Sequence, residues 1–310
     1  MQKSVIVIAG PTASGKSKLA IDLALAIDGE VVNADSMQVY EDTPVLSAMP
    51  SSEDKKKVSH RLYGVFSSLR NGSVVDWLDL AVKEIKELWK KGKVPVVVGG
   101  TGLYIDNLIN GTTPIPEISK EIKDKVSAML KEKGVNGLYE ELLSVDKEAA
   151  LRLSENDTTR VRRALEVFYY TGVSISKWHK KKMDKKIDAK FVVVKILPDK
   201  EELDKRIDMR LDKMVEMGAL EEVEALLKKG LNKNMPAMKA LGVPELRAYL
   251  DNEISLEEAV LLAKVHTHQY TKRQKTWFKN KLEADIVLDG CYNGEKDVLK
   301  NILSVAQYVL

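Results

Sequence analysis

One glycine-bounded loop constrains the fold of this chain more than any other feature. Residues 10–17 read Gly-Pro-Thr-Ala-Ser-Gly-Lys-Ser and match the pattern G-x-x-x-x-G-K-[ST]. An apolar, β-branched run at 4–9 precedes the loop, and apolar residues at helical spacing follow it over 18–27. This order of strand, loop and helix directs loop amides and a helix N-terminus at an anion. The segment therefore predicts a polyphosphate site. Lys16 would place its positive charge beside the phosphate oxygens, and Ser17 would offer its hydroxyl to Mg2+.

Two polar segments directly follow other predicted strands. Asp35 comes after the short apolar run 31–32, and Gly99-Gly100-Thr101 comes after the valine-rich run 94–98. The carboxyl ends of parallel strands meet at one sheet edge, where open α/β sheets bind their ligands. We therefore predict that Asp35 and Thr101 lie beside the phosphate-binding loop. The alternative for each segment is a plain turn between a strand and a helix.

The order of predicted elements changes in the middle of the chain. The segment Thr112-Thr-Pro-Ile-Pro116 interrupts the α/β pattern, and the next apolar strand is predicted at 191–197. Residues 119–133, 137–143 and 157–170 between them read as helices. We therefore predict an α/β fold, a P-loop NTPase-like parallel sheet flanked by helices, formed by 1–112 and 191–310. Residues 113–190 are predicted to be a mostly helical insertion domain.

Basic residues gather on predicted helices although the net charge of the chain is only +3. Arg160 and Arg163 share one face of the helix at 157–170. The predicted helix at 199–217 carries two arginines four residues apart, Arg206 and Arg210. The predicted helix at 255–281 carries a basic stripe formed by His268, Lys272, Lys275 and Lys279. These faces are candidates for phosphate and nucleic-acid contacts, and a solvated basic surface is the alternative.

Other features limit the class of protein. The single cysteine, Cys291, excludes a disulfide within the chain and any zinc site that needs two of its cysteines. No apolar run approaches the length of a membrane span. The first residues lead straight into a predicted strand, so we expect no signal peptide and a cytoplasmic protein.

Five segments in series resemble one family closely. They are Gly10-Pro-Thr-Ala-Ser-Gly-Lys-Ser17, Asp35-Ser-Met-Gln38-Val-Tyr40, Gly99-Gly-Thr-Gly-Leu-Tyr104, Asn156-Asp-Thr-Thr-Arg-Val-Arg-Arg-Ala-Leu-Glu-Val167 and Lys272-Arg-Gln-Lys-Thr-Trp-Phe278. Together they resemble the tRNA dimethylallyltransferases, the tRNA isopentenyltransferases of bacteria, over nearly the whole chain. One departure is Gly242-Val243-Pro244, where that family usually has Gly-Tyr.

The resemblance implies a specific reaction. A dimethylallyl group would pass from dimethylallyl diphosphate to N6 of adenosine 37 in tRNAs that read codons beginning with U. The products would be N6-(dimethylallyl)adenosine and diphosphate. We also expect Mg2+ as cofactor, inferred from Ser17 and a diphosphate, the tRNA anticodon stem-loop as partner, and a monomeric protein.

The resemblance assigns roles to residues at matching positions. Asp35 would be the base that accepts the N6 proton, with Thr101, Lys16 and Arg210 completing the catalytic set. The diphosphate would bind Gly10, Pro11, Thr12, Ala13, Ser14, Gly15, Lys16 and Ser17, and Ser17 would hold the metal. The tRNA would contact Asp35, Ser36, Met37, Gln38, Thr101, Lys123, Thr159, Arg160, Val161, Arg162, Arg163, Lys239, Gly242, Lys272, Arg273 and Gln274.

Three other functions remain open at this point. A small-molecule kinase would share the phosphate-binding loop. An adenylate isopentenyltransferase would act on free AMP, which needs neither the insertion nor the basic helix. A nucleotide-gated RNA-binding protein would use the same loop without turnover of an allylic donor.

Overall fold

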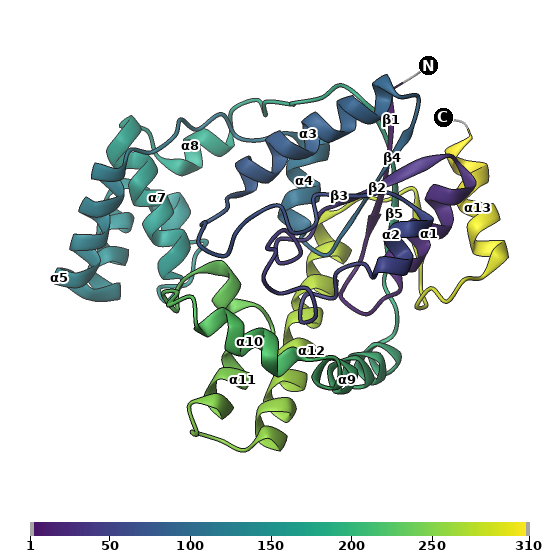
Figure 1. Cartoon of the computed structure of the whole chain (residues 1–310). Helices are drawn as coiled ribbons and strands as arrows, with labels where there is room; N and C mark the ends of the chain where they lie inside the picture. The colour runs from purple at the N-terminus through teal and green to yellow at the C-terminus, as the bar shows by residue number, and fades with distance from the viewer. Residues whose placement is uncertain (1–2, 308–310) are drawn as a thin grey trace. The chain divides into compact units, whose positions relative to one another are not determined.

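The computed structural model describes residues 3–307, and this part of the chain forms two compact units (Figure 1). The larger unit contains residues up to Ile109 and those from Lys186 onward, and the smaller unit is Asn110–Lys185. The insertion predicted from the sequence spans 113–190, which is shifted by a few residues at each end. No described helix is both long and apolar enough to cross a bilayer.

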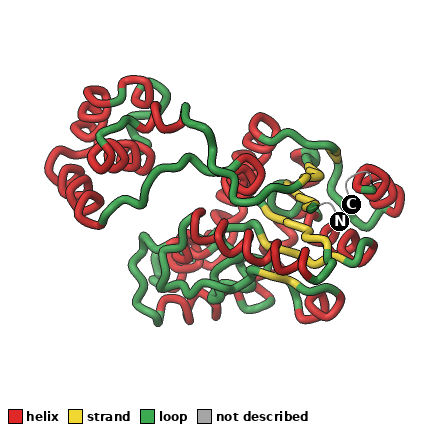
Figure 2. Tube along the Cα trace, turned by 90° about the horizontal axis from the view of Figure 1, so that it is seen from above, coloured by secondary structure: helices red, strands yellow, loops and turns green. Residues whose placement is uncertain are grey.

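The larger unit is built around a six-stranded sheet in which every strand pair is parallel. The strand order is β3-β2-β4-β1-β5-β6. The strands are β1 (Ser4–Ala9), β2 (Gly29–Asn33), β3 (His60–Arg61), β4 (Val94–Gly99), β5 (Lys190–Ile196) and β6 (Ile286–Leu288). Helices lie on both sides of these strands (Figure 2), so the expected fold class is confirmed.

Alternate residues of the central strand enter two separate cores. Val5 and Val7 of β1 pack into one core, whereas Ile6 and Ile8 pack into the other. This follows from the two-residue period of a strand, and it explains why β1 reads as a continuous apolar run. The carboxyl ends of the strands remain free to carry the loops that the sequence analysis selected.

The helices of the larger unit divide between the two faces of the sheet. Helices α1 and α13 lie side by side and pack into the core that contains Ile6 (Figure 1). The bounds are α1 (Lys16–Ala26), α2 (Ser52–Lys57), α3 (Val74–Lys90), α4 (Gly102–Asn110), α9 (Lys200–Glu216), α10 (Ala219–Leu227), η1 (Pro236–Lys239), α11 (Val243–Leu250), α12 (Leu256–Lys281) and α13 (Lys296–Ala306). Ser255 and Glu258 form a capping box at the start of α12.

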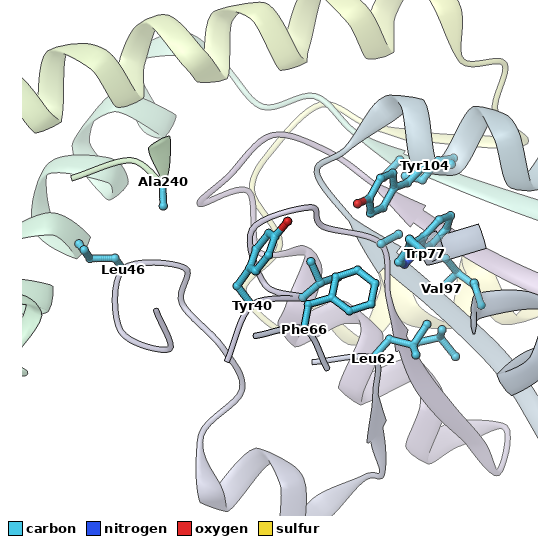
Figure 3. Close-up of a cluster of buried hydrophobic side chains, with 14 of the residues drawn as sticks. Tyr40, Leu46, Leu62, Phe66, Trp77, Val97, Tyr104 and Ala240 are labelled. Atoms are coloured by element: carbon cyan, nitrogen blue, oxygen red, sulfur yellow. The ribbon is translucent and has the colours of Figure 1, made fainter. Parts of the chain in front are cut away.

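The core on the other face supports the loop that follows β2. Trp77 of α3 is fully buried and stacks on Tyr104 of α4, with ring centroids 4.3 Å apart (Figure 3). The Trp77 indole donates a 2.8 Å hydrogen bond to the carbonyl of Asn33, the last residue of β2. A buried aromatic pair therefore fixes the strand end from which Asp35 emerges.

The smaller unit is helical and has its own core. Its helices are α5 (Lys120–Val145), α6 (Lys147–Ala150), α7 (Thr158–Thr171) and α8 (Ile175–His179). Gly134 interrupts α5 with φ 69°, where the sequence analysis placed the break between two helices. Backbone hydrogen bonds of 2.8 and 3.0 Å between Thr112 and Asp184 join the two ends of the unit. The chain thus enters and leaves the insertion at adjacent points.

Candidate active site

The phosphate-binding loop connects β1 to α1 as predicted, and its glycines are sterically required. A Cβ on Gly10 would lie 2.9 Å from the carbonyl oxygen of Ile196. Gly15 has φ +87°, and a Cβ there would lie 2.2 Å from the carbonyl oxygen of Tyr292. Within residues 3–307 no group bonds to the buried Ser14 hydroxyl, which leaves a donor in the loop for a ligand.

Lys16 stands at the first position of α1, with its ammonium folded onto the loop. Its Nζ donates a 3.2 Å hydrogen bond to the carbonyl of Pro11. Burial lowers the pKa of Lys16 to about 8, Asp35 opposes this shift, and Arg210 adds to it. The first turn of α1 contains no acidic residue, so the helix N-terminus stays positive. The loop is therefore a cationic site that an anion would stabilise.

Arg210 reaches the same loop from α9. Its Nη2 donates a 2.6 Å hydrogen bond to the hydroxyl of Thr12, and burial lowers its pKa to about 10. Arg206, four residues earlier on the same helix, contacts the Asn293 side chain and lies 3.3 Å from a carboxylate oxygen of Glu202. Of the two arginines, Arg210 is thus the one that contacts the loop.

Asp35 is held in a tight turn just after β2. Its amide donates a 2.9 Å hydrogen bond to Oδ1 of Asn33, and its own Oδ1 accepts a 3.0 Å hydrogen bond from the amide of Met37. Thr101 lies beside this turn, where its hydroxyl accepts from the amide of Ser36 at 2.9 Å and donates to the Ser36 hydroxyl at 3.1 Å. The two predicted strand-end segments therefore form one hydrogen-bonded unit.

Thr12, Asp35 and Arg210 line one cavity of about 290 Å3 within the larger unit. Its lining joins the loops after β1 and β2 to α9, α12 and the segment before α11: Thr12, Asp35, Ser36, Met37, Arg210, Lys239, Tyr270 and Arg273. A carboxylate and a set of cations thus open into the same space. The arrangement can hold an anionic group at one end and take up a proton at the other.

The structure separates the predicted tRNA contacts into accessible and inaccessible positions. Lys123, Thr159, Arg160 and Arg163 are exposed and Arg162 is half-buried, all on the smaller unit. Lys272 and Arg273 are exposed on α12.

Two of the predicted contact positions have buried side chains. The Val161 side chain is only 1% exposed and packs in the core of the smaller unit, so that side chain does not face tRNA. Gln274 is buried too, and its amide bonds to the Thr12 amide and the Gly100 carbonyl within the protein. The Gln38 amide nitrogen donates to the carbonyls of Ser47 and Ala48, at 2.9 Å each.

Gly242 contributes backbone shape rather than a contacting side chain. Its φ is +91°, and a Cβ there would lie 2.8 Å from Cδ2 of Leu46. Leu46 also lines the 290 Å3 cavity. The departure that follows Gly242 fits this structure, because Val243 is fully buried and Pro244 falls in the first turn of α11.

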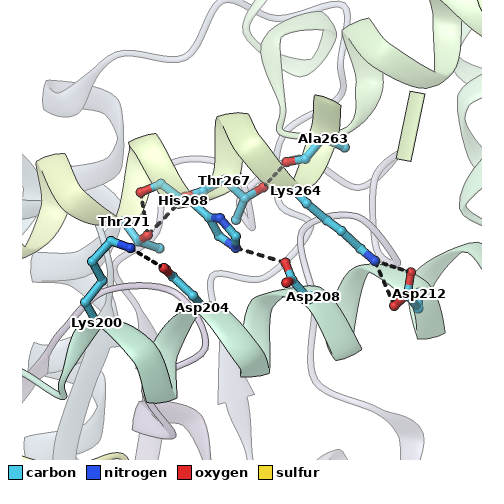
Figure 4. A network of polar contacts seen from close by, with 9 residues as sticks. All are labelled: Lys200, Asp204, Asp208, Asp212, Ala263, Lys264, Thr267, His268 and Thr271. Carbon is cyan, nitrogen blue, oxygen red and sulfur yellow. Dashed lines mark hydrogen bonds and ion pairs between the residues drawn. The ribbon is translucent and has the colours of Figure 1, made fainter. Parts of the chain in front are cut away.

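The predicted basic stripe on α12 faces α9 and borders a groove of about 420 Å3. His268 Nε2 lies 2.9 Å from Oδ1 of Asp208, as Figure 4 shows. Lys275 donates a 2.6 Å hydrogen bond to the carbonyl of Pro198. Two of the four stripe residues are therefore engaged within the protein, whereas Lys272 and Lys279 are exposed.

Sequence reasoning missed one residue that shapes the cavity. Glu222 of α10 accepts hydrogen bonds from the amides of Val45 at 2.6 Å and Leu46 at 2.9 Å. Burial raises the pKa of this carboxyl. Nothing near Glu222 in the sequence signals the role, because its partners lie about 180 residues away.

Fold and site together define a class of protein. A parallel sheet with a phosphate-binding loop, two cations on that loop and a carboxylate in the same cavity is an α/β P-loop protein with a group-transfer site. Among the described residues no cluster of three His, Cys, Asp or Glu side chains could hold a metal ion by itself. Cys291 is free and buried.

Comparisons with known proteins identify the family. A family model described as IPP transferase matches residues 38–281. The tRNA dimethylallyltransferase of Pelagibacter ubique (strain HTCC1062) is 40% identical over 288 residues, which cover 93% of this chain and 92% of that protein. That of Rickettsia felis is 38% identical over 303 residues, covering 97% and 98%. This chain therefore belongs to the IPP transferase family.

Solved structures of similar proteins agree with this assignment. The tRNA isopentenylpyrophosphate transferase from Bacillus halodurans has a TM-score of 0.72 and 31% identity, with 99% of this chain and 97% of that chain covered. A eukaryotic dimethylallyltransferase acting on tRNA has a TM-score of 0.84 and 29% identity, with 98% and 78% covered. The similarity includes both units of this chain, because nearly all its residues are covered.

Proposed function

We propose that this chain transfers the dimethylallyl group of dimethylallyl diphosphate to N6 of adenosine 37 in tRNA. The accepting tRNAs would be those that read codons beginning with U. The observation that carries the proposal is the single cavity that joins Asp35 to the cationic phosphate-binding loop. The names of the relatives, and the eukaryotic structure described as acting on tRNA, support this choice of substrate.

The loop and its two cations would act on the leaving group. As the bond between the allylic carbon and the diphosphate oxygen breaks, the oxygen keeps the electron pair and the carbon gains cationic character. Lys16 and Arg210 both lie at the loop, where negative charge on the diphosphate would increase in the transition state. Groups placed in this way stabilise the transition state more than the ground state.

Asp35 would act on the acceptor. The adenine amine is weakly basic, but it becomes acidic once the new bond between N6 and carbon forms. A carboxylate is then a sufficient base for the N6 proton, which would leave as that bond forms. The amide of Met37 bonds to Oδ1 of Asp35 and fixes the direction of the carboxylate. Neutral N6-(dimethylallyl)adenosine and diphosphate would result.

Ser17 and the diphosphate would hold Mg2+. Mg2+ binds through few protein ligands together with substrate phosphates and water, which fits a site where the loop offers hydroxyl groups. Ser17 is exposed at the start of α1, and the buried Ser14 hydroxyl has no partner within residues 3–307. When bound, Mg2+ would neutralise charge on the departing diphosphate.

The acceptor base would have to leave the stacked anticodon loop to enter the cavity. Lys239 and Arg273 line that cavity and could contact the RNA backbone near the extruded nucleotide. Lys123, Thr159, Arg160 and Arg163 of the smaller unit would contact the anticodon stem-loop. We propose that the chain acts as a cytoplasmic monomer.

A transfer assay tests the proposal. Labelled dimethylallyl diphosphate and Mg2+ are supplied either with an unmodified tRNA that has adenosines at positions 36–38 or with free AMP. Label in the tRNA alone is expected. Label in AMP alone would move the activity to adenylate prenylation, and label in neither, with stabilisation of the protein by ATP, would favour a kinase.

A further inference from the structure

The buried amide of Gln274 joins two loops of the active site. Gln274 lies on α12 and is only 6% exposed. Its Oε1 accepts a 3.0 Å hydrogen bond from the amide of Thr12 in the phosphate-binding loop. Its Nε2 donates a 2.8 Å hydrogen bond to the carbonyl of Gly100 in the loop after β4. One side chain therefore satisfies a backbone donor of the first loop and a backbone acceptor of the second.

The packing around this amide leaves little freedom. A Cβ on Gly100 would lie 2.4 Å from Nε2 of Gln274 and 3.2 Å from Oδ2 of Asp35. Gln274 and the Asp35 carboxylate therefore approach Gly100 together, and only a glycine fits between them. The side chain of the proposed base and the amide that holds the loops are thus packed around one residue.

A second contact holds the phosphate-binding loop at the same residue. The Thr12 hydroxyl accepts the 2.6 Å hydrogen bond from Arg210, while the Thr12 amide donates to Gln274. Thr12 is therefore fixed by α9 through its side chain and by α12 through its backbone. Moving either helix relative to the loop would break one of these hydrogen bonds.

We propose that Gln274 is a positioning residue that sets the donor diphosphate at the right distance and direction from Asp35. It would do so by fixing the Thr12 loop against the Gly100 loop, and it would not contact the tRNA. The proposal rests on the function proposed above, because positioning is measured through transfer. It replaces the tRNA contact that the sequence resemblance assigned to this residue.

The amide group itself is what this role requires. The glutamine amide offers an acceptor oxygen and a donor NH2 group, which match the Thr12 amide and the Gly100 carbonyl, respectively. Glutamate keeps the size but has no donor, so its carboxylate would face the Gly100 carbonyl oxygen. Methionine keeps the length and offers neither group, leaving the Thr12 amide and the buried Gly100 carbonyl without this partner. Gln274→Glu and Gln274→Met therefore remove one and two of these hydrogen bonds.

Steady-state transfer kinetics of these variants test the proposal. The matched control is Gln269→Met, which makes the same substitution at an exposed position of α12. Displacement of reacting groups by about 1 Å costs about 100-fold in rate, so we expect kcat to fall about 100-fold in Gln274→Met. We also expect a higher KM for dimethylallyl diphosphate and an unchanged KM for tRNA. Gln274→Glu should retain more activity, and Gln269→Met should match the wild type.

A double-mutant cycle with Gly100→Ala sharpens the test. The new Cβ would displace the Gln274 amide, so both single variants should break the same hydrogen bonds. Combining Gly100→Ala with Gln274→Met should then cost no more than the worse single change. Fully additive losses would overturn the proposal, as would an unchanged kcat in Gln274→Met.

Two further results distinguish a positioning role from a tRNA contact and from failure of the proposed function. A rise in the tRNA KM alone would overturn the positioning role in favour of a tRNA contact. A wild-type protein that transfers nothing would overturn the proposed function itself. In that case calorimetry of diphosphate binding still tests Gln274: equal affinity in wild type and Gln274→Met would overturn the fixation of the loop. Thermal melting shows whether each variant is folded.

Discussion

Raising the pH should weaken binding of the diphosphate donor through Lys16. Burial lowers the pKa of this ammonium group to about 8 in the free protein. The charged form binds the anion, so affinity is full below pH 8 and is lost as the pH rises through that value. The protonated fraction falls from about nine tenths at pH 7 to about one tenth at pH 9. The apparent Kd should therefore rise about tenfold across this range.

Isothermal titration calorimetry with dimethylallyl diphosphate, at fixed Mg2+ and without tRNA, measures this change. Binding should also take up about half a proton at pH 8, visible as a dependence of the heat on the buffer. The matched control is Lys16→Arg, because a guanidinium stays charged over the whole range. Its affinity should change little from pH 7 to pH 9. A wild-type affinity that is equally flat would refute the reasoning from burial.

Three other changes probe the base, the basic helix and the strand ends. Asp35→Asn should lower kcat by about 10²- to 10⁴-fold with little change in donor affinity, measured by single-turnover transfer and calorimetry. Neutralising Lys272 and Lys279 should weaken the salt dependence of tRNA binding. The slope of log affinity against log salt concentration should fall in magnitude by about one for each phosphate contact removed. An unaltered slope would mean that neither lysine contacts the RNA. Gly99→Ala should destabilise the protein by about 1–3 kcal/mol or more in urea unfolding, because its Cβ would lie 2.0 Å from the carbonyl oxygen of Ala34. Wild-type stability in that variant would contradict the steric argument.

The sheet was predictable because its strands carry strong local signals. β1, β4 and β5 lie in the middle of a parallel sheet, so they are covered on both faces and read as continuous apolar runs. β3 was not predicted, because a strand of two residues, His60 and Arg61, is too short to show any period. Sequence reasoning therefore succeeds where burial acts on many consecutive residues.

The site was predictable where each group follows a strand end. Asp35, Thr101 and Lys16 were found because strand ends of a parallel sheet meet at one edge. Val161 shows the opposite case: the resemblance gave one continuous segment, but a helix exposes only part of its residues. Val161 and Leu165 are four apart and face the core of the smaller unit, whereas Arg160 and Arg163 are exposed. Helical periodicity within the segment could have shown that the Val161 side chain faces the core.

The basic stripe on α12 shows why charge spacing alone overestimates a binding surface. The residues share a helix face as predicted, but part of that face is paired with α9. Asp208 and Asp212 repeat at four-residue spacing and meet His268 and Lys264, respectively, in antiparallel order (Figure 4). Such matching periods in two helices are a signal of helix pairing that can be read from sequence. Beyond the paired region, Lys272 and Lys279 remain exposed at the groove, so theirs are the stripe charges left for RNA phosphates.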